Sequence, residues 1–430
     1  MKINRRRFIF GSVLVGGGAL FTYSATRPSR HRRANVDLAQ GEERYITSFI
    51  KIEPGNEITI YVPHSEMGQG IHTSLSMMAA DELDANWEEV NIEQAPAIDL
   101  FANGDLVRGF AGEFGVPDFL MGLVGASAFA VAEIGNLQTT GGSSSVRYTG
   151  EHGMRVAGAA ARKMLIEAAA VRWGVPVEGL STKLSHVQHN ATGRSFSYGE
   201  LAAEAALMEP PENPRLKDRS QFNIMGKAIS RNDIPAKVDG SAMYGLDAHS
   251  DDMLYAAIRM APVFGTKLVS ANTQPAFSVR GVEDVIELED SVAVVADSYW
   301  RAKKALELVE TEWEASENDS VSSTDIAARF DRELADSNGS KDKEVGDADA
   351  ALSSAADYIE ASYRVPYLAH AAMEPMNCTV HIKGDTADLW TSTQDALGIK
   401  GRVARIAGLK EDNVAFHQTY CGGGFGRRLP

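Results

Sequence analysis

A glycine-rich segment near the end of the sequence has the composition of an anion-binding loop. Cys421–Arg428 reads Cys-Gly-Gly-Gly-Phe-Gly-Arg-Arg, and its glycines let the backbone approach a ligand closely because no Cβ intervenes. Successive backbone N–H groups in such a loop form a concave anion site, and the two arginines add charge-assisted donors for phosphate. The alternative is a tight turn without a ligand. The glycine order is not G-x-G-x-x-G, so the loop does not indicate a dinucleotide fold.

Two further stretches place glycines and hydroxyl groups at the start of a predicted helix. The first, 64–70, reads His-Ser-Glu-Met-Gly-Gln-Gly and precedes a helical pattern for which Thr73 is the expected N-cap. The second, 139–147, reads Thr-Thr-Gly-Gly-Ser-Ser-Ser-Val-Arg and precedes an apolar stripe of helical spacing from Met154 to Ala168. Helix N-termini favour anions, so each stretch is a candidate anion site. Taken alone, each also suits an ordinary strand-to-helix turn.

Gln394 and the segment before it connect these loops to a known family. Gln394 ends a Thr-Ser-Thr-Gln run and precedes Phe425 by 31 residues, and 367–377 reads Tyr-Leu-Ala-His-Ala-Ala-Met-Glu-Pro-Met-Asn. Together with the glycine loops, this pattern resembles the molybdenum-binding subunit of the xanthine dehydrogenase and aldehyde oxidase family, and within it the isoquinoline 1-oxidoreductase beta-subunit branch. The resemblance covers nearly everything from about residue 45 to 430. It implies that the Gln394 side chain and the backbone N–H of Phe425 face the apical oxygen of the molybdenum.

The same resemblance assigns other loop residues to the pterin cofactor. The implied cofactor-binding residues are Gly68, Gln69, Gly70, Thr140, Gly142, Ser143, Ser145, Gly423, Gly424, Gly426 and Arg427. Gly142 is placed near the substrate channel, and no side chain is expected to ligate the metal directly. The expected cofactor is molybdenum-molybdopterin, in the cytosine dinucleotide form of this branch.

The reaction implied by the resemblance is hydroxylation of an N-heteroaromatic compound or oxidation of an aldehyde, with water as the oxygen source. A metal supplies the nucleophile near neutral pH, and Gln394 and the Phe425 amide tune its oxo ligand. Two electrons leave through a small iron–sulfur subunit with [2Fe-2S] clusters, because Cys378 and Cys421, the only cysteines, cannot supply four thiolates. A cytochrome c is a further candidate electron acceptor. The formal charge of −16 argues against nucleic acid as a partner.

The first residues have the pattern of an export signal. Arg5, Arg6 and Arg7 precede Phe8 and a short, glycine-containing apolar run. This arrangement resembles a twin-arginine signal and predicts export of the folded protein to the periplasm. The alternative is an N-terminal membrane anchor, because no clear cleavage site follows the apolar run. Residues 1–40 are therefore set apart as signal and linker.

The remaining sequence predicts an α+β, multi-domain molybdenum hydroxylase large-subunit fold that is incomplete at the C-terminus. The expected parts are a molybdopterin-binding segment at 45–210, a small α+β hammerhead-like domain at 220–314, an acidic linker at 315–350, and the start of a second molybdopterin-binding domain at 351–430.

Local patterns place secondary structure within these parts. Alternating apolar residues at 46–63, interrupted by Pro-Gly-Asn, indicate a hairpin. The apolar, glycine-rich stretch 97–138 is expected to pack against its own domain rather than to form a lid. In the small domain, strands are expected near 253–260 and 282–296 and a helix over 299–308. The acidic linker is expected to hold an exposed helix at 324–335.

The C-terminal end departs from the family pattern. Family members continue for several hundred residues beyond the glycine loop and carry their catalytic glutamate there, whereas this sequence stops at Pro430. We therefore expect this chain to be inactive alone and a C-terminal completing polypeptide to close the site. The alternative is a truncated, non-catalytic fragment that binds cofactor or partner only. A nucleotide-binding enzyme is a third interpretation, which the absence of both G-x-x-x-x-G-K-[ST] and G-x-G-x-x-G disfavours.

One apparent metal site is discounted. His370, Glu374 and Cys378 have the spacing of ligands on one helix face, but Pro375 interrupts such a helix. The resemblance instead implies that Glu374 orders its loop through hydrogen bonds. Cys378 and Cys421 are expected to be free thiols.

Overall fold

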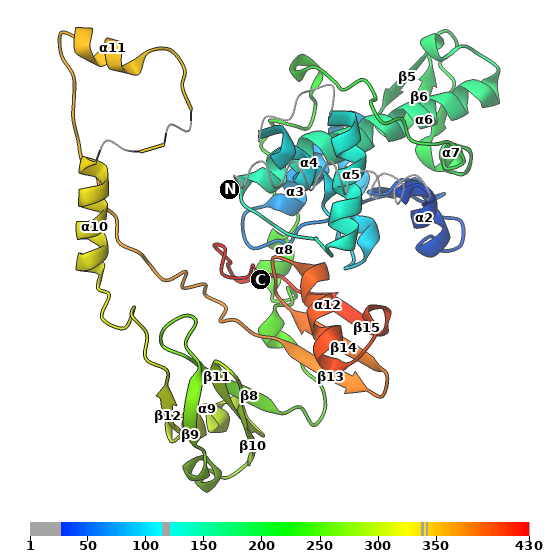
Figure 1. Cartoon of the computed structure of the whole chain (residues 1–430). Helices are drawn as coiled ribbons and strands as arrows, with labels where there is room; N and C mark the ends of the chain where they lie inside the picture. Colours follow the sequence, from blue (N-terminus) through cyan, green and yellow to red (C-terminus); the bar gives the residue numbers. More distant parts are fainter. Residues whose placement is uncertain (1–26, 114–120, 337–338, 341–342, 430) are drawn as a thin grey trace. The chain divides into compact units, whose positions relative to one another are not determined.

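The computed structural model describes residues 27–113, 121–336, 339–340 and 343–429 (Figure 1). The predicted twin-arginine signal lies outside the described residues. The chain forms two compact units, one made of the residues up to Ala248 together with those from His370, the other of His249–Ala369. Both helices and strands are present, which confirms the predicted α+β class. In the described ranges, no helix is both long enough and apolar enough to span a bilayer.

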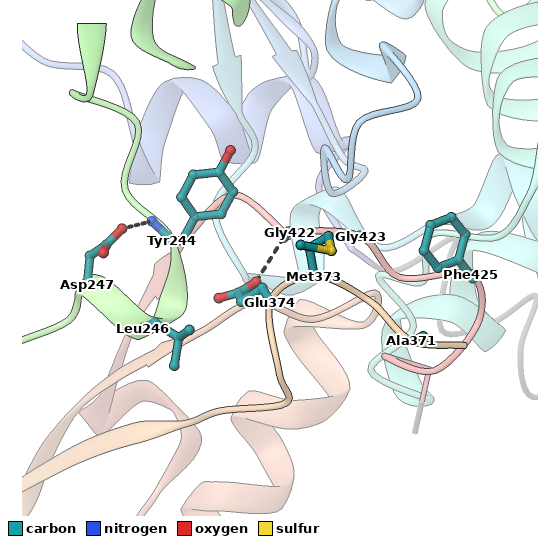
Figure 2. A pocket seen from close by; sticks show the side chains of 9 residues that line it. All are labelled: Tyr244, Leu246, Asp247, Ala371, Met373, Glu374, Gly422, Gly423 and Phe425. Carbon is teal, nitrogen blue, oxygen red and sulfur yellow. Dashed lines mark hydrogen bonds between the residues drawn. The ribbon is translucent and has the colours of Figure 1, made fainter. Parts of the chain in front are cut away.

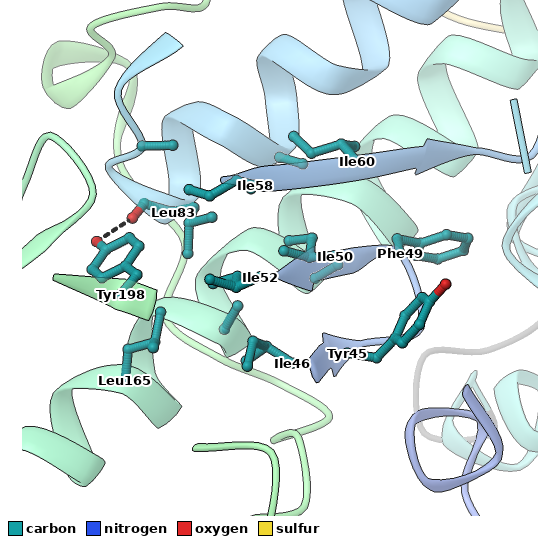
Figure 3. Close-up of a cluster of buried hydrophobic side chains, with 14 of the residues drawn as sticks. Tyr45, Ile46, Phe49, Ile50, Ile52, Ile58, Ile60, Leu83, Leu165 and Tyr198 are labelled. Atoms are coloured by element: carbon teal, nitrogen blue, oxygen red, sulfur yellow. Dashed lines mark hydrogen bonds between the residues drawn. The ribbon is translucent and has the colours of Figure 1, made fainter. Parts of the chain in front are cut away.

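The first unit contains a four-stranded sheet in the order β1-β2-β3-β4. Its strands are β1 (Arg44–Thr47), β2 (Ile50–Ile52), β3 (Ile58–Val62) and β4 (Val90–Gln94). β2 and β3 pair antiparallel with Ile52 opposite Ile58, which confirms the predicted hairpin, and β3 and β4 are parallel. Isoleucines on β2 and β3 are fully buried (Figure 3), because β-branched side chains pack well on a covered sheet.

Two helices connect this sheet to the candidate loops. α3 (Ile71–Leu83) joins β3 to β4 and packs against α6 (Arg155–Trp173). Where they meet, a Cβ on Gly158 would lie 2.2 Å from the Ala79 carbonyl oxygen, so only glycine permits this approach. A π-helix, η4 (Ser145–Met154), leads directly into α6. The predicted apolar stripe is confirmed as a buried face made of Met154, Ala157, Ala161, Met164, Leu165 and Ala168.

The stretch 97–138 is mostly helical where it is described. α4 (Gly104–Glu113) and α5 (Met121–Ile134) pack together, and α4 contacts η4, in keeping with the predicted packing role. The other elements before Ala248 are α2 (Arg30–Asp37), η1 (Trp87–Glu89), η2 (Asp99–Phe101), η5 (Val177–Gly179), β5 (Leu180–Lys183), β6 (His186–His189), β7 (Ser195–Ser197), α7 (Tyr198–Ala205), η6 (Arg219–Gln221), α8 (Ile234–Asp239) and η7 (Gly245–Asp247).

The C-terminal part of the first unit is a three-stranded sheet covered by one helix (orange to red in Figure 1). Its elements are β13 (Thr379–Lys383), β14 (Thr386–Thr391), α12 (Ala396–Ala407), η9 (Glu411–Asn413) and β15 (Val414–Gln418). β14 and β15 are parallel, so their carboxyl ends lie at the same edge of the sheet. Gln394 follows β14 and Cys421 follows β15, and ligands bind at this edge in many α/β sheets.

The second unit has its own small core. Its sheets have the orders β10-β11-β8 and β12-β9. Its elements are β8 (Tyr255–Met260), β9 (Leu268–Asn272), η8 (Gln274–Ser278), β10 (Val282–Glu287), β11 (Ser291–Ala296), α9 (Tyr299–Glu307), β12 (Glu310–Trp313), α10 (Ser323–Ala335) and α11 (Ala348–Ser354). The predicted strands near 253–260 and 282–296, the helix over 299–308 and the exposed helix at 324–335 are confirmed.

The unit boundaries differ from the sequence-based ones. Residues 220–248 group with the first unit rather than with the small domain. The backbone N–H groups of Asn223, Ile224 and Met225 donate to the buried Asp81 carboxylate on α3, which ties this stretch to the first unit. Residues 351–369 group with the second unit. Hydrogen bonds over such long sequence separations leave no local pattern in the sequence.

Candidate functional site

Gln394 joins two of the predicted cofactor loops through buried hydrogen bonds. Its Nε2 donates to the Thr140 carbonyl oxygen at 2.9 Å, and its Oε1 accepts from the Arg428 backbone N–H at 3.3 Å. Its own backbone adds a bond to each loop, from Thr140 N to Gln394 O and from Gln394 N to Arg428 O. The side chain is only 2% exposed. Gln394 therefore fixes the 139–147 loop against the glycine loop.

The hydroxyl groups of the 139–147 loop divide into two kinds. Thr140 and Ser145 are fully buried, and their Oγ atoms accept from Ser65 N and Gly141 N, each at 2.8 Å. Gly142 and Ser143 lie exposed at the tip, and a Cβ on Gly142 would meet nothing within 4 Å. The buried hydroxyl groups of Thr140 and Ser145 fix the conformation of the loop, and Gly142 and Ser143 at its tip are accessible to a ligand.

The Gly-Gln-Gly turn is organised by Glu66. Its buried carboxylate accepts from Gly68 N at 2.9 Å, Gly70 N at 3.0 Å and His72 N at 3.2 Å. α3 begins at Ile71 with Gly70 as its N-cap in a left-handed conformation, φ 79°. The predicted Thr73 N-cap is therefore wrong, because Glu66 already satisfies the first amides. Thr73 instead donates its hydroxyl to Asn232 Oδ1.

Gln69 folds back on its own turn. Its Oε1 accepts from Met67 N at 2.7 Å and its Nε2 donates to the Ser65 carbonyl oxygen at 3.0 Å. The residue is exposed, as is Gly68 beside it. The Glu66 carboxylate neutralises the positive N-terminal end of α3. The backbone N–H groups that it binds are therefore not available to an anionic ligand.

Arg428 is buried in an ion pair rather than presented to a ligand. Its Nη2 donates to Glu374 Oε2 at 2.9 Å and to the Glu374 carbonyl oxygen at 2.7 Å. Its Nη1 donates to the Ser392 oxygens and its Nε to the Gly423 carbonyl oxygen. The prediction that both arginines bind phosphate is wrong for Arg428, because its guanidinium is committed inside the protein. Arg427 is exposed.

Glu374 orders its loop, as the family resemblance implied. Its carboxylate accepts from Gly422 N at 2.8 Å, Ser392 Oγ at 2.9 Å and Asn377 Nδ2 at 2.9 Å, besides Arg428. Burial alone would raise the pKa of Glu374, but the hydrogen bonds from Gly422, Asn377 and Ser392 and the charge of Arg428 hold it below its ordinary value. No helix carries His370, Glu374 and Cys378, so these residues do not align on one face.

In the glycine loop, the backbone at Gly424 lies very close to neighbouring side chains of the protein. A Cβ on Gly424 would lie 2.6 Å from Met67 Sδ and 2.9 Å from Gln394 Oε1. Phe425 adopts φ 54°, which is uncommon for a bulky residue, and the residue is 73% exposed. Within the described residues, the backbone N–H groups of Gly424, Phe425 and Gly426 donate to no protein acceptor. Gly424 is buried, whereas Phe425 and Gly426 are exposed. Three consecutive free amides in such a loop fit an anionic or oxo-bearing cofactor.

A cleft of about 590 Å³ adjoins the glycine loop (Figure 2). Its lining is mainly apolar and aromatic and comprises Tyr244, Leu246, Asp247, Ala371, Met373, Glu374, Gly422, Gly423 and Phe425. In Figure 2 the Tyr244 and Phe425 rings stand at opposite ends of this lining, with Met373 and Glu374 between them. Beside the cleft, Cys421 is buried and free, and burial raises the pKa of its thiol to about 12. Cys378 is free and exposed.

Comparison with known proteins identifies this region. The family model of the molybdopterin cofactor-binding domain matches residues 331–430. This part of the chain is therefore similar to the molybdopterin cofactor-binding domain family. The match includes Gln394, Glu374 and the whole glycine loop, and it supports the resemblance drawn from those residues.

Similarity to known proteins extends well beyond residues 331–430. The chain is 30% identical over 423 residues to isoquinoline 1-oxidoreductase subunit beta of Brevundimonas diminuta, covering 89% of this chain and 51% of that protein. It is 28% identical over 447 residues to the membrane-bound aldehyde dehydrogenase (pyrroloquinoline-quinone) of Gluconacetobacter polyoxogenes, covering 100% of this chain and 52% of that protein. The chain thus spans about half the length of these relatives.

Among solved structures, quinoline 2-oxidoreductase from Pseudomonas putida 86 matches with a TM-score of 0.35 and 18% sequence identity. This match covers 47% of the present chain and 31% of that one.

Two residues that shape the predicted cofactor loops were not identified from the sequence. Glu66 belongs to the 64–70 stretch, but the sequence analysis did not predict its capping role. A carboxylate just before a Gly-Gln-Gly turn and a helix start is nevertheless a recognisable capping signal. Arg231 contacts the same turn from a sequence separation of 165 residues, for which the sequence holds no signal.

Proposed function

We propose that this chain binds a molybdenum-molybdopterin cofactor as part of the large subunit of an oxidoreductase that hydroxylates an N-heteroaromatic compound or oxidises an aldehyde. The observation that carries the proposal is the convergence of the 139–147 loop and the glycine loop at Gln394. Gln394 and the glycine loop lie within residues 331–430, which the family model of the molybdopterin cofactor-binding domain matches. Two relatives are an isoquinoline 1-oxidoreductase subunit and an aldehyde dehydrogenase, which supports both substrate classes.

The residues of this chain hold and orient the cofactor in this proposal. Gly424, Phe425 and Gly426 present free backbone N–H groups, and Gly142 and Ser143 present an open loop tip. Gln394 has a second Nε2 hydrogen besides the one donated to Thr140, and this hydrogen is available to a neighbouring oxo group. When bound, the cofactor supplies the two-electron redox chemistry and the activation of water.

Finer features follow from the family branch. We propose the cytosine dinucleotide form of the cofactor, a small iron–sulfur subunit with [2Fe-2S] clusters as the first electron acceptor, and a cytochrome c as a later one. We also propose export of the folded protein to the periplasm. The name of the Brevundimonas relative, a subunit beta, supports assembly with a partner subunit.

The proposal is tested by cofactor analysis of Gln394→Ala. The chain is purified from a molybdate-supplied host, alone and with a co-expressed iron–sulfur subunit, and molybdenum, pterin and pyrroloquinoline quinone are measured. We expect molybdenum and pterin in wild type and about tenfold less in the variant, because two buried hydrogen bonds between the loops are lost.

The matched control is Gln188→Ala, on β6 of the same unit, which should retain wild-type molybdenum. Wild-type protein without molybdenum or pterin in both preparations would refute the proposed function. Pyrroloquinoline quinone in place of pterin would also refute it and would point to the chemistry named for the Gluconacetobacter relative.

A further inference from the structure

Arg231 clamps the Gly-Gln-Gly turn from a distant part of the sequence. Its Nη1 donates to the Gly68 carbonyl oxygen at 2.7 Å, and its Nη2 donates to Glu66 Oε1 at 3.1 Å. One guanidinium therefore holds both the main chain of the turn and the carboxylate that organises it. A planar fork with several donors suits such a double contact, which a lysine ammonium reproduces poorly.

Arg231 is itself held in place. Asp233 accepts from Arg231 Nε at 2.8 Å and from Arg231 Nη2, and Lys237 donates to the same carboxylate. Asp233 is 1% exposed. Next to Arg231, the Asn232 backbone N–H donates to Thr73 Oγ1 at 3.1 Å, in the first turn of α3. Residues 231–237 thus form a fixed support outside the predicted cofactor loops.

Glu66 connects residues 231–237 to the glycine loop. Its carbonyl oxygen accepts from the Cys421 backbone N–H at 3.0 Å, where the glycine loop begins. Its carboxylate meanwhile holds the amides of Gly68 and Gly70. The same residue therefore joins the turn and the glycine loop, and Arg231 is the cation that fixes the carboxylate.

We propose that Arg231 is a positioning residue for the cofactor site: through Glu66 it sets the Gly-Gln-Gly turn and the Cys421–Arg428 loop in register with each other. The cofactor part of this inference rests on the proposed function. The loop-ordering part does not, because its contacts lie entirely within the protein.

The test compares Arg231→Ala and Arg231→Lys with the matched control Arg172→Ala. Arg172 pairs with Glu204 and has a side chain 33% exposed, against 32% for Arg231. Hydrogen exchange is measured by mass spectrometry in peptides covering 66–72 and 421–428. In Arg231→Ala we expect about tenfold faster exchange in both peptides, from the loss of charge-assisted hydrogen bonds. Arg231→Lys should be intermediate, and Arg172→Ala should match wild type in both.

Molybdenum content is measured on the same proteins. We expect a loss in Arg231→Ala and partial recovery in Arg231→Lys. The inference is overturned if exchange in 421–428 is unchanged, or if both loops loosen while molybdenum content stays at the wild-type level. If wild type itself holds no molybdenum, the proposed function fails, and the exchange data alone then decide whether Arg231 orders the two loops.

Discussion

Arg428→Ala should lower the free energy of unfolding of the first unit by about 3–5 kcal/mol, because it leaves the Glu374 carboxylate buried without its cation. The guanidinium is fully buried and also bonds Ser392 and the Gly423 carbonyl oxygen, so several acceptors lose their donor at once. Urea unfolding followed by far-UV circular dichroism measures the loss.

Arg427→Ala is the neighbouring control. Arg427 is exposed, and its replacement should change stability by no more than about 0.5 kcal/mol. Adding Glu374→Gln to Arg428→Ala should recover part of the loss, since the unpaired charge is then removed. Equal effects of the two arginine variants would show that the Glu374–Arg428 pair does not hold the loop.

The same ion pair predicts a response to acid. The folded-state pKa of Glu374 lies below its ordinary value of 4.5, so its stabilising contribution is fully present above about pH 4.5 and is lost as the pH falls through the lowered pKa. Without Arg428 that pKa rises, and the acid unfolding midpoint should move to higher pH. A midpoint that does not move, measured by circular dichroism, would contradict this assignment.

Gly158→Ala should destabilise the first unit although alanine is the better helix former. The propensity gain is about 1 kcal/mol, but the added Cβ would overlap the Ala79 carbonyl oxygen, and relieving such overpacking costs roughly 3 kcal/mol. The net loss should therefore be about 2 kcal/mol. Because α3 follows the Gly-Gln-Gly turn and α6 follows the 139–147 loop, separating these helices should also reduce molybdenum content.

Gly55→Ala provides the comparison for this variant. Gly55 lies in the turn between β2 and β3, and a Cβ there would meet nothing within 4 Å. The Gly55→Ala substitution should leave both the melting temperature and the molybdenum content unchanged. A Gly158→Ala protein as stable as Gly55→Ala would mean that α3 and α6 separate at little cost.

The sequence singled out the three loops that meet in the structure because their signals are local. Glycines and hydroxyl groups before helices mark 64–70 and 139–147 whatever lies around them, and strand alternation marked the hairpin at 46–63. The local sequence did not indicate which side chains would be buried and hydrogen-bonded inside the protein. Arg427 and Arg428 are chemically identical neighbours, and only the path of the folded loop sends Arg428 inward to Glu374.

Long-range contacts account for the other differences. Thr73 has the side chain of an N-cap, yet Glu66 takes that role because Gly68 and Gly70 adopt positive φ values and bring their amides to its carboxylate. Residues 220–248 carry no chemical motif and still supply Arg231. The roles expected for Gln394 and Phe425 toward the metal rest on family resemblance alone, since neither residue type by itself indicates molybdenum.

The buried thiol of Cys421 makes the glycine loop observable without a cofactor. A thiol with a pKa near 12 is almost wholly protonated at neutral pH, and only the thiolate attacks an alkylating reagent and displaces its leaving group. Cys378, on the surface, should be alkylated first, and Cys421 only in the moments when the loop opens. In a Cys378→Ser variant, the rate at which Cys421 is alkylated therefore reports the rate at which the loop opens. This rate can be measured by mass spectrometry of the intact chain.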